Sequence, residues 1–163
     1  MSVLSSEAVI PLPRDEVFPF FAKAENLEKL TPASLRFTIT SPLPIRMEEG
    51  AIIDYRIKIG GIPQRWRSVI RIWAPPHRFA DEQVKGPYKK WFHTHTFEEC
   101  DQGTRMRDHV EYELPFGILG RIARPLIRRQ LRSIFTYRNT KIGEVFDVPE
   151  GRGLVRGPIE FAG

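Results

Sequence analysis

The sequence contains one cysteine, Cys100, among its 163 residues. An internal disulfide is therefore excluded, and the composition favours a reducing compartment, so we expect a cytoplasmic protein. No run of 18 apolar residues occurs, so we expect no transmembrane helix. The first residues, MSVLSSEAVIPLP, also lack the basic start and long apolar run of a signal peptide. What remains is a globular chain of ordinary composition, 41% hydrophobic and 28% charged.

Recognisable phosphate-binding and nucleophilic motifs are also lacking. The short GRG near the end of the chain has no strand and helix around it, and Cys100 has no evident base nearby. The net charge is +5, and much of the excess lies in RIARPLIRRQLRSIFTYR, residues 121–138. Its arginines are Arg121, Arg124, Arg128, Arg129, Arg132 and Arg138. A basic amphipathic helix binds anionic membranes or RNA, but the same pattern is typical of a solvated helix face.

The order of apolar patterns predicts an α+β fold. A strand at 2–10 precedes two short helices at 14–30, which Pro19 and the AEN segment divide. About six antiparallel strands follow up to residue 114, because period-2 alternation dominates there. In the strand at 64–73 the side chains expected to point inward are Trp66, Ser68, Ile70 and Ile72. A curved sheet of six to seven strands would then wrap around one long C-terminal helix at 117–146.

That closing helix carries a broad apolar stripe expected to pack in the core. The members of the stripe are Ile118, Ile122, Leu126, Leu131, Ile134, Phe135, Ile142 and Val145. We assign residues 1–146 to one domain and residues 147–163, rich in glycine and proline, to a C-terminal tail that is mobile or packs on a neighbour. A sheet curved around such a helix leaves an apolar cavity between the two.

Two histidines alternate with threonines in WFHTHTFEECDQGTRMRDHVEYEL, residues 91–114. If Glu99 pairs with Thr104 across the CDQG turn, then His95 lies opposite Asp108. The residues expected on the inner face are Trp91, His93, His95 and Phe97 on one strand, and Met106, Asp108, Val110 and Tyr112 on the other. A buried carboxylate needs a partner, which His95 supplies.

The histidine pair has several interpretations. It is a structural pair that fixes the strand register, a set of contacts to a ligand, or an acid-base catalyst in which Asp108 orients His95 as the base and His93 is a donor. Two imidazoles on one strand face also suit a metal, but no third ligand stands at a matching position, so we expect neither a metal nor a cofactor.

The residues expected to line the cavity combine large aromatic side chains with a few polar groups. They are Tyr55, Trp66, Ser68, Trp91, His93, His95, Phe97, Met106, Asp108 and Tyr112. Either Glu82 or Gln83 also faces inward, since alternation sends one of two neighbours to each side.

The element order, together with APPHRFADEQVKGPYKKWFHTHTFE and GTRMRDHVEYELPFGILGRIARPLIRRQLRSIFTYR, resembles the START-like (SRPBCC) superfamily over residues 3–146. The similarity is greatest to its bacterial branch of polyketide cyclase/dehydrase-like and ligand-binding proteins. The resemblance implies a helix-grip fold with an internal apolar cavity, and no catalytic residue carries over. We therefore expect a protein that binds a small hydrophobic or amphipathic molecule. The alternatives are a cyclase/dehydratase-type enzyme using His95 and Asp108, and a membrane- or ribosome-associated adaptor using the basic helix.

Overall fold

The computed structural model describes residues 1–115, 117–148 and 155–163, apart from the side chains of Leu119 and Arg121. In chain order the elements are β1 (Ser2–Ile10), α1 (Arg14–Phe21), the 3-10 helices η1 (Ala24–Leu30) and η2 (Ala33–Leu35), β2 (Thr38–Ile39), β3 (Ile52–Ile59), β4 (Ile62–Ala74), β5 (Arg78–Lys85), β6 (Lys90–Cys100), β7 (Gly103–Glu113), α2 (Gly117–Val145), β8 (Val155–Arg156) and β9 (Glu160–Ala162).

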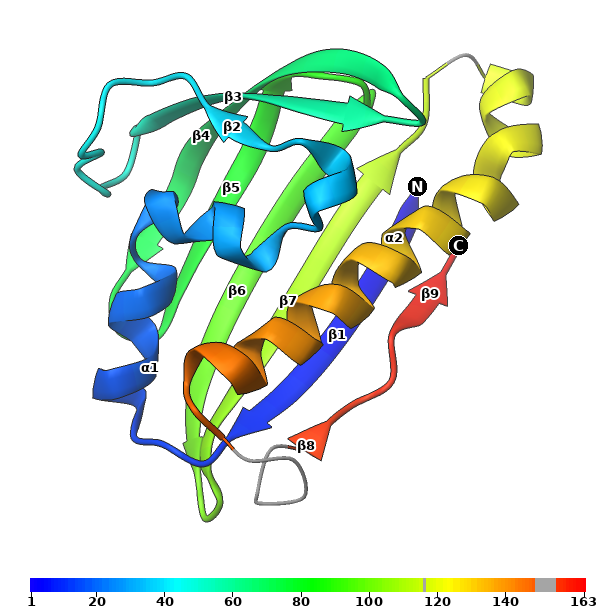
Figure 1. Cartoon of the computed structure of the whole chain (residues 1–163). Helices are drawn as coiled ribbons and strands as arrows, with labels where there is room; N and C mark the ends of the chain where they lie inside the picture. The colour runs from blue at the N-terminus through cyan, green and yellow to red at the C-terminus, as the bar shows by residue number, and fades with distance from the viewer. Residues whose placement is uncertain (116, 149–154) are drawn as a thin grey trace.

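The described strands form one antiparallel sheet in the order β2-β3-β4-β5-β6-β7-β1-β8, and β9 also pairs with β1. The sheet curves around α2, with α1, η1 and η2 covering the inner face beside it (Figure 1). This is the α+β helix-grip architecture expected from the sequence. The sheet has nine described strands rather than six to seven, because the short strands β8 and β9 lie in the segment that was expected to be a C-terminal tail.

The core lies between the inner face of the sheet and the C-terminal part of α2. One cluster of buried side chains includes Trp66, Trp91 and Phe135, and a second, beneath α1, includes Phe18 and Phe97. The two short helices lie within residues 14–30 as predicted, but the break between them falls at Ala22 and Lys23. Pro19 lies inside α1, and the AEN segment begins η1. Their apolar side chains close the cavity on the side away from the strands.

The strand β4 departs from the predicted alternation at one position. A bulge between Ile70 and Ile72 shifts the pairing with β5, so that Ile72 lies opposite Ala80 while Trp73 lies opposite the buried Phe79. Trp73 packs at 5.9 Å from the Phe79 ring, so it takes the inward position predicted for Ile72. The expectation for Ile72 was wrong because one extra residue in a strand reverses the faces beyond it.

The apolar stripe of α2 is buried along only part of its length. Leu131, Phe135 and Ile142 are at most 4% exposed, whereas Ile118, Ile122 and Leu126 are 68–72% exposed. The first turns of α2 stand away from the strands (Figure 1), so the sheet does not cover them. The expectation that all of these residues pack in the core was therefore wrong for the first three.

The chain returns to the sheet after α2. Residues 155–156 pair with Ala8 and Val9 of β1, and residues 160–162 pair with Val3, Leu4 and Ser5. Residues 149–154 of the segment expected to be a tail lie outside the described residues. The last nine residues of that segment thus extend the sheet of the same chain along β1. Within the described residues, neither α-helix is long and apolar enough to cross a membrane.

Candidate functional site

The two strands that carry the histidines pair in the predicted register. Glu99 lies opposite Thr104, His95 opposite Asp108, and Trp91 opposite Tyr112. His95 is 5% exposed and Asp108 is 3% exposed, so both side chains point away from solvent. The register prediction is confirmed along the whole hairpin.

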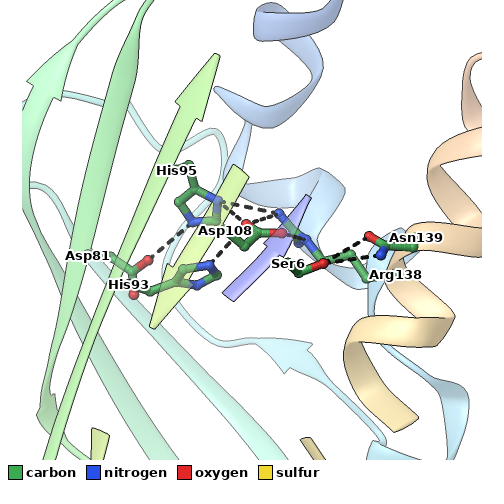
Figure 2. A network of polar contacts seen from close by, with 7 residues as sticks. All are labelled: Ser6, Asp81, His93, His95, Asp108, Arg138 and Asn139. Carbon is green, nitrogen blue, oxygen red and sulfur yellow. Dashed lines mark hydrogen bonds and ion pairs between the residues drawn. The ribbon is translucent and has the colours of Figure 1, made fainter. Parts of the chain in front are cut away.

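Asp108 is the centre of a polar network between β6, β7 and α2 (Figure 2). Its Oδ1 atom lies 2.8 Å from His95 Nδ1 and accepts a hydrogen bond from His93 Nε2 at 3.0 Å. Its Oδ2 atom accepts a hydrogen bond from Arg138 Nε at 3.0 Å. A carboxylate accepts hydrogen bonds and donates none, so each facing histidine nitrogen carries a proton. Asp108 therefore fixes the orientation of both imidazoles.

Asp81 on β5 is a site residue that sequence reasoning missed. Its Oδ1 atom lies 3.6 Å from His95 Nε2, and its Oδ2 atom accepts a hydrogen bond at 3.0 Å from Ser68, which itself accepts one from the Trp66 indole. Phe79, Asp81 and Gln83 share one face of β5, so the apolar Phe79 was the signal that could have placed Asp81 inward.

Arg138 is the second missed residue, because it was expected on the basic outer face of the closing helix. It is 5% exposed and donates hydrogen bonds to both oxygens of Asp108. The apolar residues Leu131, Phe135 and Ile142 lie at spacings of seven, three and four residues from it. Helical periodicity alone therefore placed Arg138 on the buried face. Next to it, Asn139 donates to Ser6 of β1 at 3.1 Å.

The charges in this network differ between the two histidines. Burial lowers the pKa of His93 to about 4, and a charge on His95 adds to this effect, so the ring is neutral near pH 7. Burial also disfavours a charge on His95, but the carboxylates of Asp108 and Asp81 more than offset it and raise its pKa. Both nitrogens of His95 face a carboxylate, which fits a protonated ring.

The pKa values of both aspartates lie below their ordinary range although burial acts in the opposite direction. For Asp108 the Arg138 guanidinium and the two imidazoles hold the pKa well down, and for Asp81 His95 has the main lowering effect. With His95 protonated and His93 neutral, two carboxylates face two cations. The buried network is thereby charge-balanced, which is the condition for burying ions without a large penalty.

A cavity of about 180 Å³ lies between the inner face of the sheet, η1 and α2. Six of the residues predicted to bind a ligand line it: Tyr55, Trp66, Ser68, Trp91, His93 and His95. Asp81 and Arg138 line it as well, beside apolar side chains such as Leu27, Ile57, Leu131 and Phe135. The polar network thus forms one wall of a mostly apolar chamber.

The other four predicted ligand contacts lie elsewhere in the core. Within the described chain, the residues lining the cavity do not include Phe97, Met106, Asp108 or Tyr112. Phe97 and Met106 pack beneath α1, and Asp108 lies behind the two histidines. Tyr112 is fully buried, and its hydroxyl has no hydrogen-bond partner among the described residues.

The choice between Glu82 and Gln83 is settled by their partners. Gln83 is 9% exposed and hydrogen-bonds the backbone of Tyr88, whereas Glu82 forms an ion pair with Arg71 on the outer face. Gln83 therefore points inward, yet among the described residues it fixes a loop and does not line the cavity. Asp81 is the acidic residue that reaches the cavity from this strand.

The arginines of α2 contact the end of the chain. Arg124 and Arg128 donate hydrogen bonds to the backbone oxygen of Gly163, and Arg132 donates one to that of Ile159 at 3.2 Å. Arg128 and Arg132 also lie over the Phe161 ring. Arg129 is exposed, and the Arg121 side chain lies outside the described residues. Three of the arginines expected to face an external partner are thus engaged within the chain.

Solved structures of the same fold come from distant organisms. The protein TTHA0849 from Thermus thermophilus is 20% identical with a TM-score of 0.66, covering 88% of this chain and 96% of that one. Protein Ms6760 from Mycobacterium smegmatis is 17% identical with a TM-score of 0.66, covering 89% and 90%. The ginseng major latex-like protein 151 from Panax ginseng is 11% identical with a TM-score of 0.64, covering 91% and 99%. These similarities confirm the fold.

A search of curated proteins finds no match. The family model described as "Polyketide cyclase / dehydrase and lipid transport" matches residues 10–135, which run from the last residue of β1 into α2 and include the cavity wall with Asp81, His93 and His95. The resemblance to the START-like superfamily is thereby confirmed. The chain belongs to the polyketide cyclase/dehydrase and lipid transport family of START-like proteins.

Proposed function

We propose that the chain is a cytoplasmic binding protein that holds one small, mostly apolar molecule in the cavity between the sheet and α2. The observation that carries this proposal is the composition of the cavity wall. Aromatic and aliphatic side chains surround it, and the polar groups converge at one place, where Asp81, His93, His95 and Arg138 meet. Ligand sites commonly combine such an apolar lining with a few fixed polar groups.

The size of the cavity limits the ligand. A dry cavity of about 150 Å³ accommodates benzene, and this one has about 180 Å³. One ring with a short polar substituent therefore fits without movement of the walls. The rings of Trp66 and Trp91 lie 5.5 Å apart at 87° and offer both a face and an edge to such a ring.

The polar wall suits an oxygen-bearing substituent such as a ketone or a phenol. Arg138 donates to Asp108 through Nε and Nη2, while its Nη1 atom has no hydrogen-bond partner among the described residues. His93 donates through Nε2, which leaves Nδ1 as an acceptor with no partner in the same part of the chain. A donor and an acceptor at one wall recognise a carbonyl or a hydroxyl oxygen.

The test is native mass spectrometry of the protein purified from its own host, followed by identification of any bound molecule. We expect a stoichiometric small molecule in the wild type that is lost in Trp91→Ala. The matched control is Phe92→Ala, the neighbour on the outer face of β6, which should keep the ligand. An equal loss in both variants, or retention in both, would contradict binding in this cavity.

A second candidate function is acid-base catalysis on a ketone, as in a cyclase/dehydratase-type enzyme. The observation in its favour is that His95 lies between two carboxylates while His93 beside it is neutral. Because the pKa of His95 is raised and that of His93 is lowered, the roles of base and proton donor are the reverse of those expected from the sequence. His95 would donate a proton to the carbonyl oxygen and His93 would accept one from carbon. Exchange of the α-protons of acetophenone in D2O, lost in His95→Gln and His93→Gln, would support this activity.

A third candidate is contact with an anionic membrane through the start of α2. The exposed side chains Ile118, Ile122 and Leu126 supply an apolar ridge, and the exposed Arg129 lies one turn further on. Apolar residues beside arginine favour a lipid surface over RNA, since RNA contacts use aromatic stacking. Co-sedimentation with vesicles containing phosphatidylserine should decrease in Ile122→Ser and with rising salt. Equal binding of the variant, or binding to RNA alone, would refute it.

A further inference from the structure

We propose that Asp81, His93 and His95 bind one divalent transition-metal ion, of the zinc or iron(II) type, at the polar wall of the cavity. One ligand atom from each of the three side chains lies within 4.8 Å of the other two. From the sequence we expected no third ligand beside the two histidines. Asp81 supplies it from the neighbouring strand β5, directly opposite His93 in the sheet.

The donor set selects the class of metal. Two imidazoles and one carboxylate form the three-ligand set that open zinc and non-haem iron(II) sites use, with the remaining positions free for water or substrate. Calcium and magnesium prefer oxygen ligands throughout, so they fit less well. The three side chains all line the cavity, and the open positions of the metal would therefore face the ligand.

Neighbouring side chains hydrogen-bond the three ligands in the way that is usual around metal sites. Metal-binding histidines usually donate their second ring N–H to a carboxylate, which fixes the ring. Asp108 is that carboxylate for both rings: its Oδ1 atom accepts a hydrogen bond from His93 Nε2 at 3.0 Å and lies 2.8 Å from His95 Nδ1. Ser68 donates to Asp81 Oδ2 and holds that carboxylate toward the histidines. Each ligand is thus already oriented by a hydrogen-bonding neighbour.

Distance and charge also fit a cation. His95 Nε2 and Asp81 Oδ1 are 3.6 Å apart, slightly more than the roughly 3.0–3.4 Å between two ligands about 2.1 Å from one ion. A small rotation of the carboxylate closes this difference. With both imidazoles neutral, two carboxylates and one guanidinium sum to −1, so a divalent ion brings the wall to +1 and favours an anionic oxygen in the open position.

Binding of the metal needs no organic ligand, so it is tested separately from the proposed function. The untagged full chain is stripped with a chelator and titrated with Zn²⁺ by calorimetry and with Co²⁺ by visible absorption. We expect one equivalent of Zn²⁺ per chain and Co²⁺ bands typical of four or five ligands. Affinity should fall at least tenfold in Asp81→Asn and in His93→Gln.

Two outer-face variants serve as matched controls: Asp54→Asn and His109→Gln should bind as the wild type does. A measurement on the wild type alone guards against misfolded variants. In the long-range ¹H–¹⁵N NMR spectrum of the histidine rings, Zn²⁺ should shift His93 and His95 but not His77 or His109. The proposal is overturned if Zn²⁺ shifts the latter pair instead, if both site variants keep full affinity, or if the wild type shows no saturable binding.

Discussion

Replacement of Asp108 by asparagine would leave the shape of the buried network and remove its central charge. Asp108 is 3% exposed and contacts three groups: Arg138 Nε at 3.0 Å, His95 at 2.8 Å and His93 at 3.0 Å. Without the carboxylate, the Arg138 guanidinium, itself 5% exposed, keeps its charge in the core with no anion beside it. We therefore expect Asp108→Asn to destabilise the whole fold.

The magnitude follows from the burial of the pair. Removal of one partner of a buried ion pair costs about 3–5 kcal/mol. In a chain of this length each kcal/mol lowers the melting temperature by about 2–4 °C, so Asp108→Asn should lower it by roughly 6–20 °C. The double variant Asp108→Asn, Arg138→Met should be more stable than Asp108→Asn alone, because it also removes the stranded charge.

Urea unfolding followed by tryptophan fluorescence measures these differences. The control is Asp54→Asn, which breaks an ion pair with Arg67 on the outer face, where the two side chains are 33% and 48% exposed. Exposed pairs contribute about 0–1 kcal/mol. If Asp108→Asn lost no more free energy of unfolding than Asp54→Asn, the network would not be a buried, charge-balanced unit.

Three further variants test other parts of the account. Leu131→Ala enlarges the cavity and should lower the free energy of unfolding by about 2–5 kcal/mol in urea; a smaller loss would indicate loose packing there. Gly103 has φ +123°, and a Cβ added there would lie 2.2 Å from the Ile10 carbonyl oxygen. Gly103→Ala should therefore lower the free energy of unfolding by more than about 1 kcal/mol, as measured by thermal unfolding. Unchanged melting would show that the turn relaxes freely. From pH 6.5 down to 4, in buffer with a chelator, the unfolded chain takes up a proton that the buried His93 ring does not accept. The free energy of unfolding of the wild type should therefore fall by about 3 kcal/mol more than that of His93→Gln over this range. Equal slopes of this free energy against pH in the two proteins would refute a neutral His93 ring.

The hairpin of β6 and β7 could be predicted in full from the sequence. Its two strands are long, alternate clearly and are joined by a short turn, so one register satisfies every inward residue. The positions of His95 and Asp108 followed from that register alone. The helix-grip fold was predictable for the same reason, since strands and closing helix have strong periodic patterns.

Asp81 and Arg138 were not found because their burial depends on partners from distant elements. A charged residue on a strand or helix is normally exposed, and the sequence gives no sign of the opposite charge that compensates it. Asp81 meets His95 across β5 and β6, and Arg138 meets Asp108 across 30 residues. Both lay on an apolar face by periodicity, so the pattern held a signal that the charge obscured.

Local irregularity and chain ends account for the other differences. The bulge near Ile72 adds one residue to β4, and no residue type in that strand marks it. The segment at 155–163 pairs with β1 through backbone hydrogen bonds, and it accepts further hydrogen bonds from arginines of α2, although its glycines and prolines are typical of loops. The exposed ridge at Ile118 reflects the length of α2 beyond the sheet, which periodicity does not report.

We propose that the cavity binds a small apolar molecule and recognises an oxygen atom at its polar wall. The most direct test is an NMR titration of the wild type with two probes of equal shape, acetophenone and α-methylstyrene, which differ by a carbonyl oxygen in place of a methylene group. We expect both probes to shift the indole N–H signals of Trp66 and Trp91, and we expect the ketone to bind more tightly. Absence of shifts with either probe, or equal affinity for both, would contradict this proposal.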